Sequence, residues 1–220
     1  MTEASIRLGA FLGVFSTMAA WELFAPWRRR QDRAGRWPAN LGLIFAETVL
    51  VRILVPLSAA GAAMLAEARG WGAFNALGAP WWLAAIASMA LLDLSIYAQH
   101  VAFHRVPALW RLHRMHHSDR VVDVTTGLRF HPLEIALSLL VKIAAVIALG
   151  APAAAVIAFE ALLNAAAMFN HANVALPPAV DRLVRLLVVT PAMHRIHHSE
   201  RRHETDSNFG FALPWWDRLF

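Results

Sequence analysis

Histidine is the residue type with the most obvious chemical potential in this chain. Eight of the eleven histidines fall in three groups with helical spacing. The groups are His100-x-x-x-His104, His113-Arg-Met-His116-His117 and His194-Arg-Ile-His197-His198. Residues at i, i+3 and i+4 lie on one face of a helix, so the imidazoles of each group can converge on a metal ion. The second and third groups are near copies, HRMHHSDR at 113–120 and HRIHHSER at 194–201.

The number of imidazoles predicts two metal ions. Eight to ten ring nitrogens exceed what one ion binds, and no H-E-x-x-H zinc motif is present. Neutral imidazole suits Zn, Cu, Fe and Ni, so the ligand type leaves the metal open. Iron(II) binds more weakly than zinc, so zinc could substitute for iron in purified protein. Because ligand imidazoles must be neutral, metal affinity is expected to fall below about pH 6.

Five apolar stretches predict an all-α integral-membrane bundle that positions these histidines. Hydrophobic residues make up 58% of the 220 residues, which is too apolar for a soluble domain of this size. A helix crosses a bilayer core with about 20 residues. The stretches are 5–25, 41–66, 80–104, 132–149 and 152–172. Gly150-Ala151-Pro152 makes the last two a hairpin that either crosses fully or only dips into the membrane, so four to five spanning or hairpin helices are expected.

The arginines predict how the bundle is oriented. They are concentrated after the first, third and fifth stretches, whereas the opposite loops carry little beyond Arg7 and Arg69. The positive-inside rule then makes the basic segments cytoplasmic and leaves the N-terminus outside. Ten of the eleven histidines fall at or just beyond the cytoplasmic ends of the last three stretches, where they would form a helical cap, and His203 lies farther along the cytoplasmic tail. We expect a multi-pass protein of a bacterial inner membrane or an equivalent membrane. Arginines placed between apolar runs argue against a nucleic-acid surface.

The chain is expected to form one membrane domain over 1–220, with anchor spans in 1–79 and a catalytic region in 80–220. The first apolar run, from Ile6 to Phe24, lacks a small-residue cleavage site before Trp27 and is interpreted as a retained anchor. The absence of cysteine excludes an iron–sulfur cluster or a thiolate nucleophile in this sequence.

Several polar residues fall within the predicted spans on the same helix faces as the histidines. Asp93 and Tyr97 share a face with His100 and His104, and Glu160 and Asn164 share one with His171. We expect Asp93 and Glu160 to accept N–H bonds and orient ligand rings, with Tyr97, Asn164 and Asn170 beside them. An interhelical hydrogen bond with no part in catalysis is the open alternative.

Six motifs run in order from Asp93 to the C-terminus. They are DLSIYAQHVAFH, RLHRMHHS, RFHPLE, FNHAN, TPAMHRIHHS and DSNFGFALPWWDRLF. In these motifs the chain resembles the fatty acid hydroxylase/sterol desaturase superfamily of membrane di-iron enzymes, over well more than half its length. The chain stops at Phe220, where such proteins usually continue.

The resemblance implies an O2-dependent oxidation by two histidine-bound irons. Hydrogen abstraction from a C–H bond would give an alcohol after rebound, or an alkene after a second abstraction. The implied ligands are His100, His104, His113, His116, His117, His171, His194, His197 and His198. His131 matches a family position as a ligand or as a residue that orients one, and His203 has no motif around it. The implied substrate is a membrane lipid, such as a fatty acyl chain, sterol, hopanoid or carotenoid.

With no redox module in the sequence, the resemblance also implies a separate electron donor at the cytoplasmic face. The donor would be ferredoxin-like, flavodoxin-like or cytochrome b5-like, and Arg114, Arg195, Arg201 and Arg202 could form its docking surface.

The sequence is compatible with three functions. The first is a lipid hydroxylase, with a desaturase as its nearest variant. The second is a membrane protein that binds or transports metal, which would favour ligands near mid-membrane. The third is a degenerate protein that keeps zinc for stability, which the eight intact motif histidines argue against.

Overall fold

The structure is a computed structural model that describes residues 3–29 and 33–220. Its elements are α1 (Glu3–Phe24), α2 (Arg33–Leu54), α3 (Ala59–Arg69), α4 (Ala73–Ala76), α5 (Trp81–Arg105), α6 (Pro107–His117), the short 3₁₀ helix η1 (Thr126–Leu128), α7 (Pro132–Leu149), α8 (Ala153–His171), α9 (Pro178–Val184), α10 (Pro191–His197), α11 (Arg202–Thr205) and α12 (Trp216–Leu219). Apart from one isolated bridge between Pro26 and Val174, the described residues form helices, turns and loops. The predicted all-α class is confirmed.

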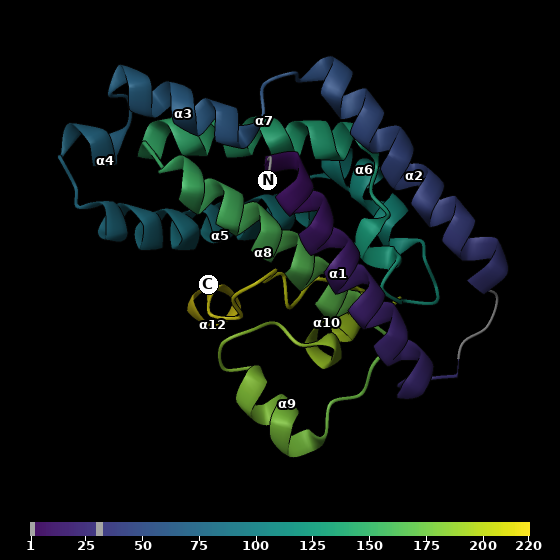
Figure 1. Cartoon of the computed structure of the whole chain (residues 1–220). Helices are drawn as coiled ribbons and strands as arrows, with labels where there is room; N and C mark the ends of the chain where they lie inside the picture. The colour runs from purple at the N-terminus through teal and green to yellow at the C-terminus, as the bar shows by residue number, and fades with distance from the viewer. Residues whose placement is uncertain (1–2, 30–32) are drawn as a thin grey trace.

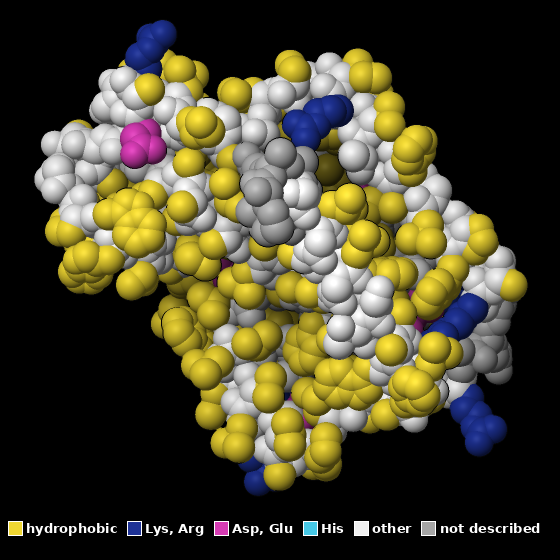
Figure 2. Space-filling view, viewed as in Figure 1, with side chains coloured by type: hydrophobic (Ala, Val, Ile, Leu, Met, Phe, Trp, Pro, Cys, Tyr) yellow, Lys and Arg dark blue, Asp and Glu magenta, His cyan; other side chains and the backbone are white. Residues whose placement is uncertain are grey.

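Four helical stretches in the described part of the chain are long and apolar enough to cross a membrane. They are Arg33–Ala76, Trp81–Arg105, Pro132–Leu149 and Ala153–His171. Helices α5, α7 and α8 lie alongside one another, α3 packs on α7 and α8, and α1 crosses α8 (Figure 1). Hydrophobic side chains are spread over the whole face shown in Figure 2, with few charged side chains among them, as expected of a lipid-facing surface. The predicted membrane bundle is confirmed.

Small and branched apolar residues hold the bundle together. Leu92 of α5 and Val146 and Val156 of α7 and α8 are fully buried in one cluster. The alanines of α3, including Ala59 and Ala62, complete this cluster. Alanine lets helix backbones approach closely, which is how helices pack tightly where lipid supplies no hydrophobic driving force.

The predicted span 41–66 is wrong as a single helix, because the chain breaks at Pro56. Helix α2 ends at Leu54, because Pro56 disfavours helical dihedrals at Val55, the residue before it. Helix α3 then starts after Ser58, whose side-chain oxygen accepts a hydrogen bond from the Gly61 amide at 3.0 Å.

The predicted first span forms α1, but α1 is not among the four stretches apolar enough to cross. It carries Arg7 near its start and Glu22 near its end. Glu22 is almost fully buried and accepts hydrogen bonds from the amides of Val124 and Asn173 at 2.7 and 2.8 Å. This carboxylate therefore ties the end of α1 to the loops that surround the histidines.

The hairpin between α7 and α8 forms at Gly150, as predicted. Gly150 ends α7 with a φ of +67°, a left-handed conformation that favours glycine. The loop before α4 presses against it, because a Cβ on Gly72 would lie 2.1 Å from the Gly150 nitrogen. Two glycines in contact close the end of the bundle remote from the histidines.

Candidate metal centre

The first two histidine motifs meet at a tight turn between α5 and α6. Helix α5 ends at Arg105, and Pro107 starts α6 at a position where its missing N–H costs nothing. The short turn folds α6 back onto the end of α5, so His113 approaches His100. Their Nε2 atoms are 3.1 Å apart.

The third motif reaches the same place on α10, a helix of only seven residues. His194 and His197 are fully buried, and His198 caps the end of the helix. His171, the last residue of α8, is also fully buried beside them.

The structure brings all nine predicted ligands together in two groups. Within each group the candidate ligand atoms lie within 4.8 Å of one another. The first group is His100, His104, His113, His117 and His197, and the second is His116, His171, His194 and His198.

The spacing of ring nitrogens in the second group fits a metal ion. Nε2 of His171 lies 3.0 Å from Nε2 of His116, of His194 and of His198. One neutral imidazole nitrogen cannot form good hydrogen bonds with three others. Two nitrogens bound at right angles to one ion, each about 2.1 Å from it, lie about 3.0 Å apart. The observed distances match coordination better than hydrogen bonding.

In the first group, buried ring nitrogens without a hydrogen-bond partner among the described residues also indicate a metal ion. Nε2 of His104 and Nε2 of His197 are buried, and no hydrogen-bond partner lies near them among the described residues. A buried polar atom left unsatisfied is costly, and a metal ion would satisfy both. The donor set therefore fits two ions.

The opposite ring nitrogens of six of these histidines face hydrogen-bond acceptors. Four of the acceptors are backbone carbonyls: that of Phe209 for His100, of Arg129 for His116, of Ala167 for His171 and of Ser207 for His197. The other two are carboxylates, Asp206 for His104 and Glu134 for His113. The Glu134 contact, at 2.6 Å, is the shortest one to a carboxylate. An Nδ1–H held outward directs the Nε2 lone pair inward, as metal ligands require.

Burial keeps the imidazoles outside the spanning helices neutral. Desolvation, followed by the charges of neighbouring imidazoles, lowers the pKa of His113, His117 and His194 well below 6.5. The pKa values of His116, His197 and His198 are lowered in the same way, with desolvation again the main cause. Neutral imidazole is the form that binds metal, so the site is prepared for it at neutral pH.

A polar layer under the second group fixes its position. Arg36 at the start of α2 pairs with Asp119 at 2.6 Å and with Asp123 at 2.8 Å. Arg129, whose carbonyl faces His116, also donates to Asn40 of α2 at 3.0 Å. Helix α2 thus supports the loop that orients a candidate ligand.

A cavity of about 380 Å³ adjoins the first histidine group. His100, His113 and Glu134 line one end of it, and the walls include Phe103, Leu128 and Phe130. An apolar chamber with a few polar groups at one end is typical of a ligand site.

The comparison with known proteins agrees with this geometry. The profile of the fatty acid hydroxylase family matches residues 85–220, more than half of the chain. The chain belongs to the fatty acid hydroxylase family. The resemblance seen in the sequence motifs is confirmed, and membership in this family supports an oxidoreductase.

Relatives of this fatty acid hydroxylase family member act on several lipids. An ornithine lipid hydroxylase from Rhizobium tropici is 29% identical over 135 residues, which are 61% of this chain and 40% of that protein. An alkylglycerol monooxygenase from Homo sapiens is 29% identical over 158 residues, 68% of this chain and 33% of that protein. A very-long-chain aldehyde decarbonylase from Oryza sativa subsp. indica is 32% identical over 147 residues, 62% of this chain and 23% of that protein. The chain thus spans less than half the length of these relatives. No solved structure matches it.

Two carboxylates expected to orient ligand rings have other partners in this family member. Asp93 accepts from the Trp216 indole at 2.8 Å, which anchors the C-terminal segment to α5. Glu160 pairs with Lys142 at 2.8 Å and with Arg7 at 2.6 Å. The carboxylates that do meet ligand rings are Glu134, at 2.6 Å from His113, and Asp206, at 3.4 Å from His104. The sequence signal for Glu134 was its position in the first helical turn after His131-Pro132, within the RFHPLE motif.

The other expected neighbours lie around the site without contacting a ligand nitrogen. Tyr97 packs edge-on against Phe209, and Asn170 donates to the Phe211 carbonyl at 3.1 Å. Asn164 lines the cavity. The ring of Phe209 packs against His104 and His197, so Tyr97 supports the first group indirectly.

The two remaining histidines lie outside both groups. His131 caps α7, where its Nδ1 accepts a hydrogen bond from the Leu133 amide at 3.2 Å. His203 is exposed near Glu204. A cap explains the conformation of His131 without a metal.

Proposed function

We propose that this chain is a membrane hydroxylase that inserts one oxygen atom of O2 into an unactivated C–H bond of a lipid. The observation that carries this proposal is the meeting of two histidine groups with an apolar cavity at His100 and His113. Family membership supports it. The activities named for the relatives from Rhizobium tropici and Homo sapiens support it as well.

The nine grouped histidines would hold two irons. His100, His104, His113, His117 and His197 would bind one, and His116, His171, His194 and His198 would bind the other. When bound, the irons supply the activation of O2 and the oxidising power for the C–H bond.

The protein's own part in the reaction is to hold the ligands and exclude water. Glu134 and the inward-facing carbonyls fix the imidazole rings before substrate arrives. Phe103, Leu128 and Phe130 form a dry wall against which a hydrocarbon segment can lie beside His113. Fixed geometry of this kind determines which C–H bond is oxidised.

A separate electron donor would dock on a basic groove that ends at the second group. The groove is lined by Arg28, Arg29, Arg120 and Arg195, and His198 of the second group also lines it. The guanidinium groups of Arg28 and Arg195 each lie 4.2 Å from the ring of Trp27. Such a surface complements a small acidic donor that is ferredoxin-like, flavodoxin-like or cytochrome b5-like.

We place this groove and the metal centre on the cytoplasmic side, with the N-terminal end of α1 toward the opposite side. The support is the positive-inside rule applied to the arginines around the groove.

The experiment that tests the proposed function compares lipids from cells with and without the gene. The expected result is a lipid that gains the mass of one oxygen only when the gene is present. A loss of two hydrogens instead would identify a desaturase. Two irons per chain after anaerobic purification are expected, and an active protein that retains only zinc would contradict the iron assignment.

A further inference from the structure

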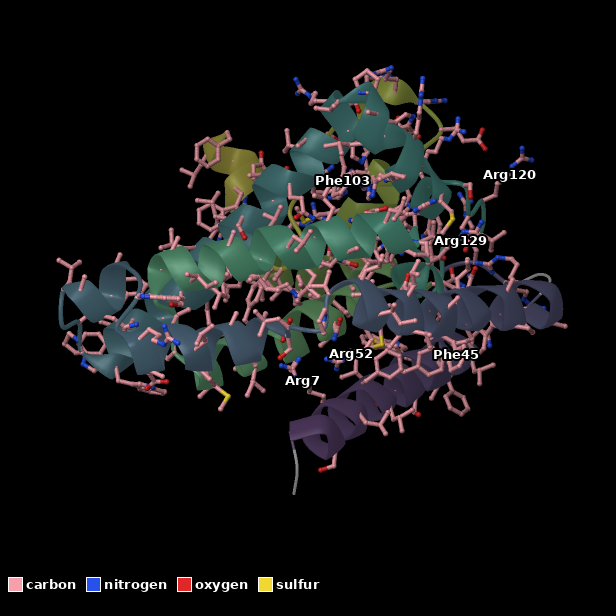
Figure 3. All side chains as sticks on the ribbon, turned by 90° about the horizontal axis from the view of Figure 1, so that it is seen from above. Arg7, Phe45, Arg52, Phe103, Arg120 and Arg129 are labelled. Carbon is pink, nitrogen blue, oxygen red and sulfur yellow. The ribbon has the colours of Figure 1, made fainter. Side chains whose placement is uncertain are left out.

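The cavity that begins at His100 and His113 ends at a cluster of cations. Lys142 and Glu160 line its remote end. A second hollow of about 530 Å³ adjoins it there and shares Glu160 among its lining residues. Arg7 and Arg52 line this second hollow. Figure 3 shows these two arginines where α1, α2 and α8 converge, and Figure 2 shows a hollow beside a cationic side chain near the start of α1.

One cation of this cluster, Arg52, has no carboxylate partner among the described residues. Glu160 uses one oxygen for Lys142 and the other for Arg7. Among the described residues no carboxylate pairs with Arg52, which is exposed to the hollow. Glu47, also on the wall, is the one further acidic residue there. Arg52 therefore brings to this hollow a positive charge that no described carboxylate pairs with. Charges of this kind within a membrane bundle usually mark a ligand site.

Lysine and arginine also have donors left over after these ion pairs form. An arginine has five N–H donors and a lysine three, so Glu160 satisfies only part of them. A phosphate or a carboxylate could accept the rest, because both form strong charge-assisted hydrogen bonds with guanidinium groups.

We propose that this cationic end binds an anionic polar group of the lipid, a phosphate or a carboxylate, through Arg52, Arg7 and Lys142. The hydrocarbon chain then runs through the cavity toward His100 and His113. This inference rests on the proposed function in taking that lipid as the substrate. Lys142 follows Glu134 by two turns of α7, which is about 12 Å along the helix. The oxidised carbon therefore lies several bonds from the anionic group, and this spacing selects its position.

The test is a binding measurement on the full chain in detergent, which requires no turnover. Native mass spectrometry would give the affinity for three probes: phosphatidylglycerol, oleate and diacylglycerol. The expected result is that phosphatidylglycerol or oleate binds at least about tenfold more tightly than diacylglycerol, the range of a charged hydrogen bond. The tighter of the two anionic probes identifies phosphate or carboxylate.

A matched pair of variants locates the site. Arg52→Gln should lose the preference for anionic lipid, whereas Arg69→Gln, on an exposed arginine that stacks on Trp71 outside the cavity, should keep it. Equal binding of the three probes by the unaltered chain, or equal loss in both variants, would overturn the inference. A preserved preference in a protein that binds no iron would refute the oxygenase proposal alone, so the two failures are distinguishable.

Discussion

Oε1 of Glu134 on α7 lies 2.6 Å from Nδ1 of His113 on α6, and both side chains are buried. The contact fixes the imidazole so that its Nε2 faces those of His100 and His117. A carboxylate behind a ligand ring raises the basicity of the ligand as well as orienting it.

Replacing Glu134 with Gln should weaken iron binding about 10- to 100-fold, the usual effect of losing such a partner. The measurement is an anaerobic titration with iron(II) followed by metal analysis. Glu67→Gln, an exposed glutamate on α3, is the control and should bind iron normally. Unchanged affinity in Glu134→Gln would show that His113 is not a ligand or needs no carboxylate.

His116→Ala and His197→Ala should each remove lipid oxidation while the protein still inserts into the membrane. Because these residues belong to different groups, each variant should lose iron from its own group and retain about one ion of the two. Metal analysis of the purified variants checks this. His203→Ala, an exposed histidine outside both groups, should keep both irons. Full activity in either ligand variant would refute the assignment.

Lowering the pH should destabilise the metal-free protein at a higher pH than it destabilises the metal-bound protein. Burial lowers the pKa of His113, His117 and His194, so below the unfolded value of about 6.5 the unfolded chain binds more protons than the folded chain. The free energy of unfolding of the metal-free protein should therefore decrease as pH falls through about 6.5. Thermal unfolding between pH 7 and pH 5 measures the effect.

The same shift changes the expectation for metal release. Histidines with lowered pKa values stay neutral below pH 6, so iron should be retained to a lower pH than the ordinary imidazole pKa predicts. Dialysis at stepped pH with metal analysis tests this. Complete release already at about pH 6 would indicate that the ligands are exposed to solvent.

Removing exposed charge from the basic groove should slow electron delivery without altering the metal site. Arg29→Gln with Arg120→Gln removes two exposed arginines of the groove, and Figure 3 shows Arg120 projecting away from the helices. Reduction by an acidic protein donor at low salt should slow several-fold, whereas reduction by dithionite should not change. An equal rate with the protein donor would place its docking site elsewhere.

Arg36→Ala should destabilise the protein, because it leaves Asp119 and the fully buried Asp123 without their cation. Breaking such a buried pair costs about 3–5 kcal/mol. Thermal unfolding in detergent would measure the loss. Arg111→Ala, on an exposed arginine of α6, should have little effect. Arg36→Lys should recover only part of the stability, because lysine cannot bind a carboxylate through two parallel hydrogen bonds.

Local patterns in the sequence were enough to predict most of the long helices and the identity of the grouped histidines. Apolar length predicted α5, α7 and α8 almost to the residue, and helical spacing placed the motif histidines on common faces. The prediction of one helix over 41–66 was wrong, because Pro56 breaks the helix although the whole segment is apolar.

The division of the histidines between the two groups depends on helix packing, which the sequence pattern does not show. His116 and His117 are neighbours in the sequence but join different groups, as do His197 and His198. Successive residues on a helix point about 100° apart. Which of them meets His100 and which meets His171 therefore depends on how α6 and α10 pack against α5 and α8. For the same reason Glu134, and not Asp93, reaches a ligand ring: contacts between distant segments follow from helix packing, which local spacing does not specify.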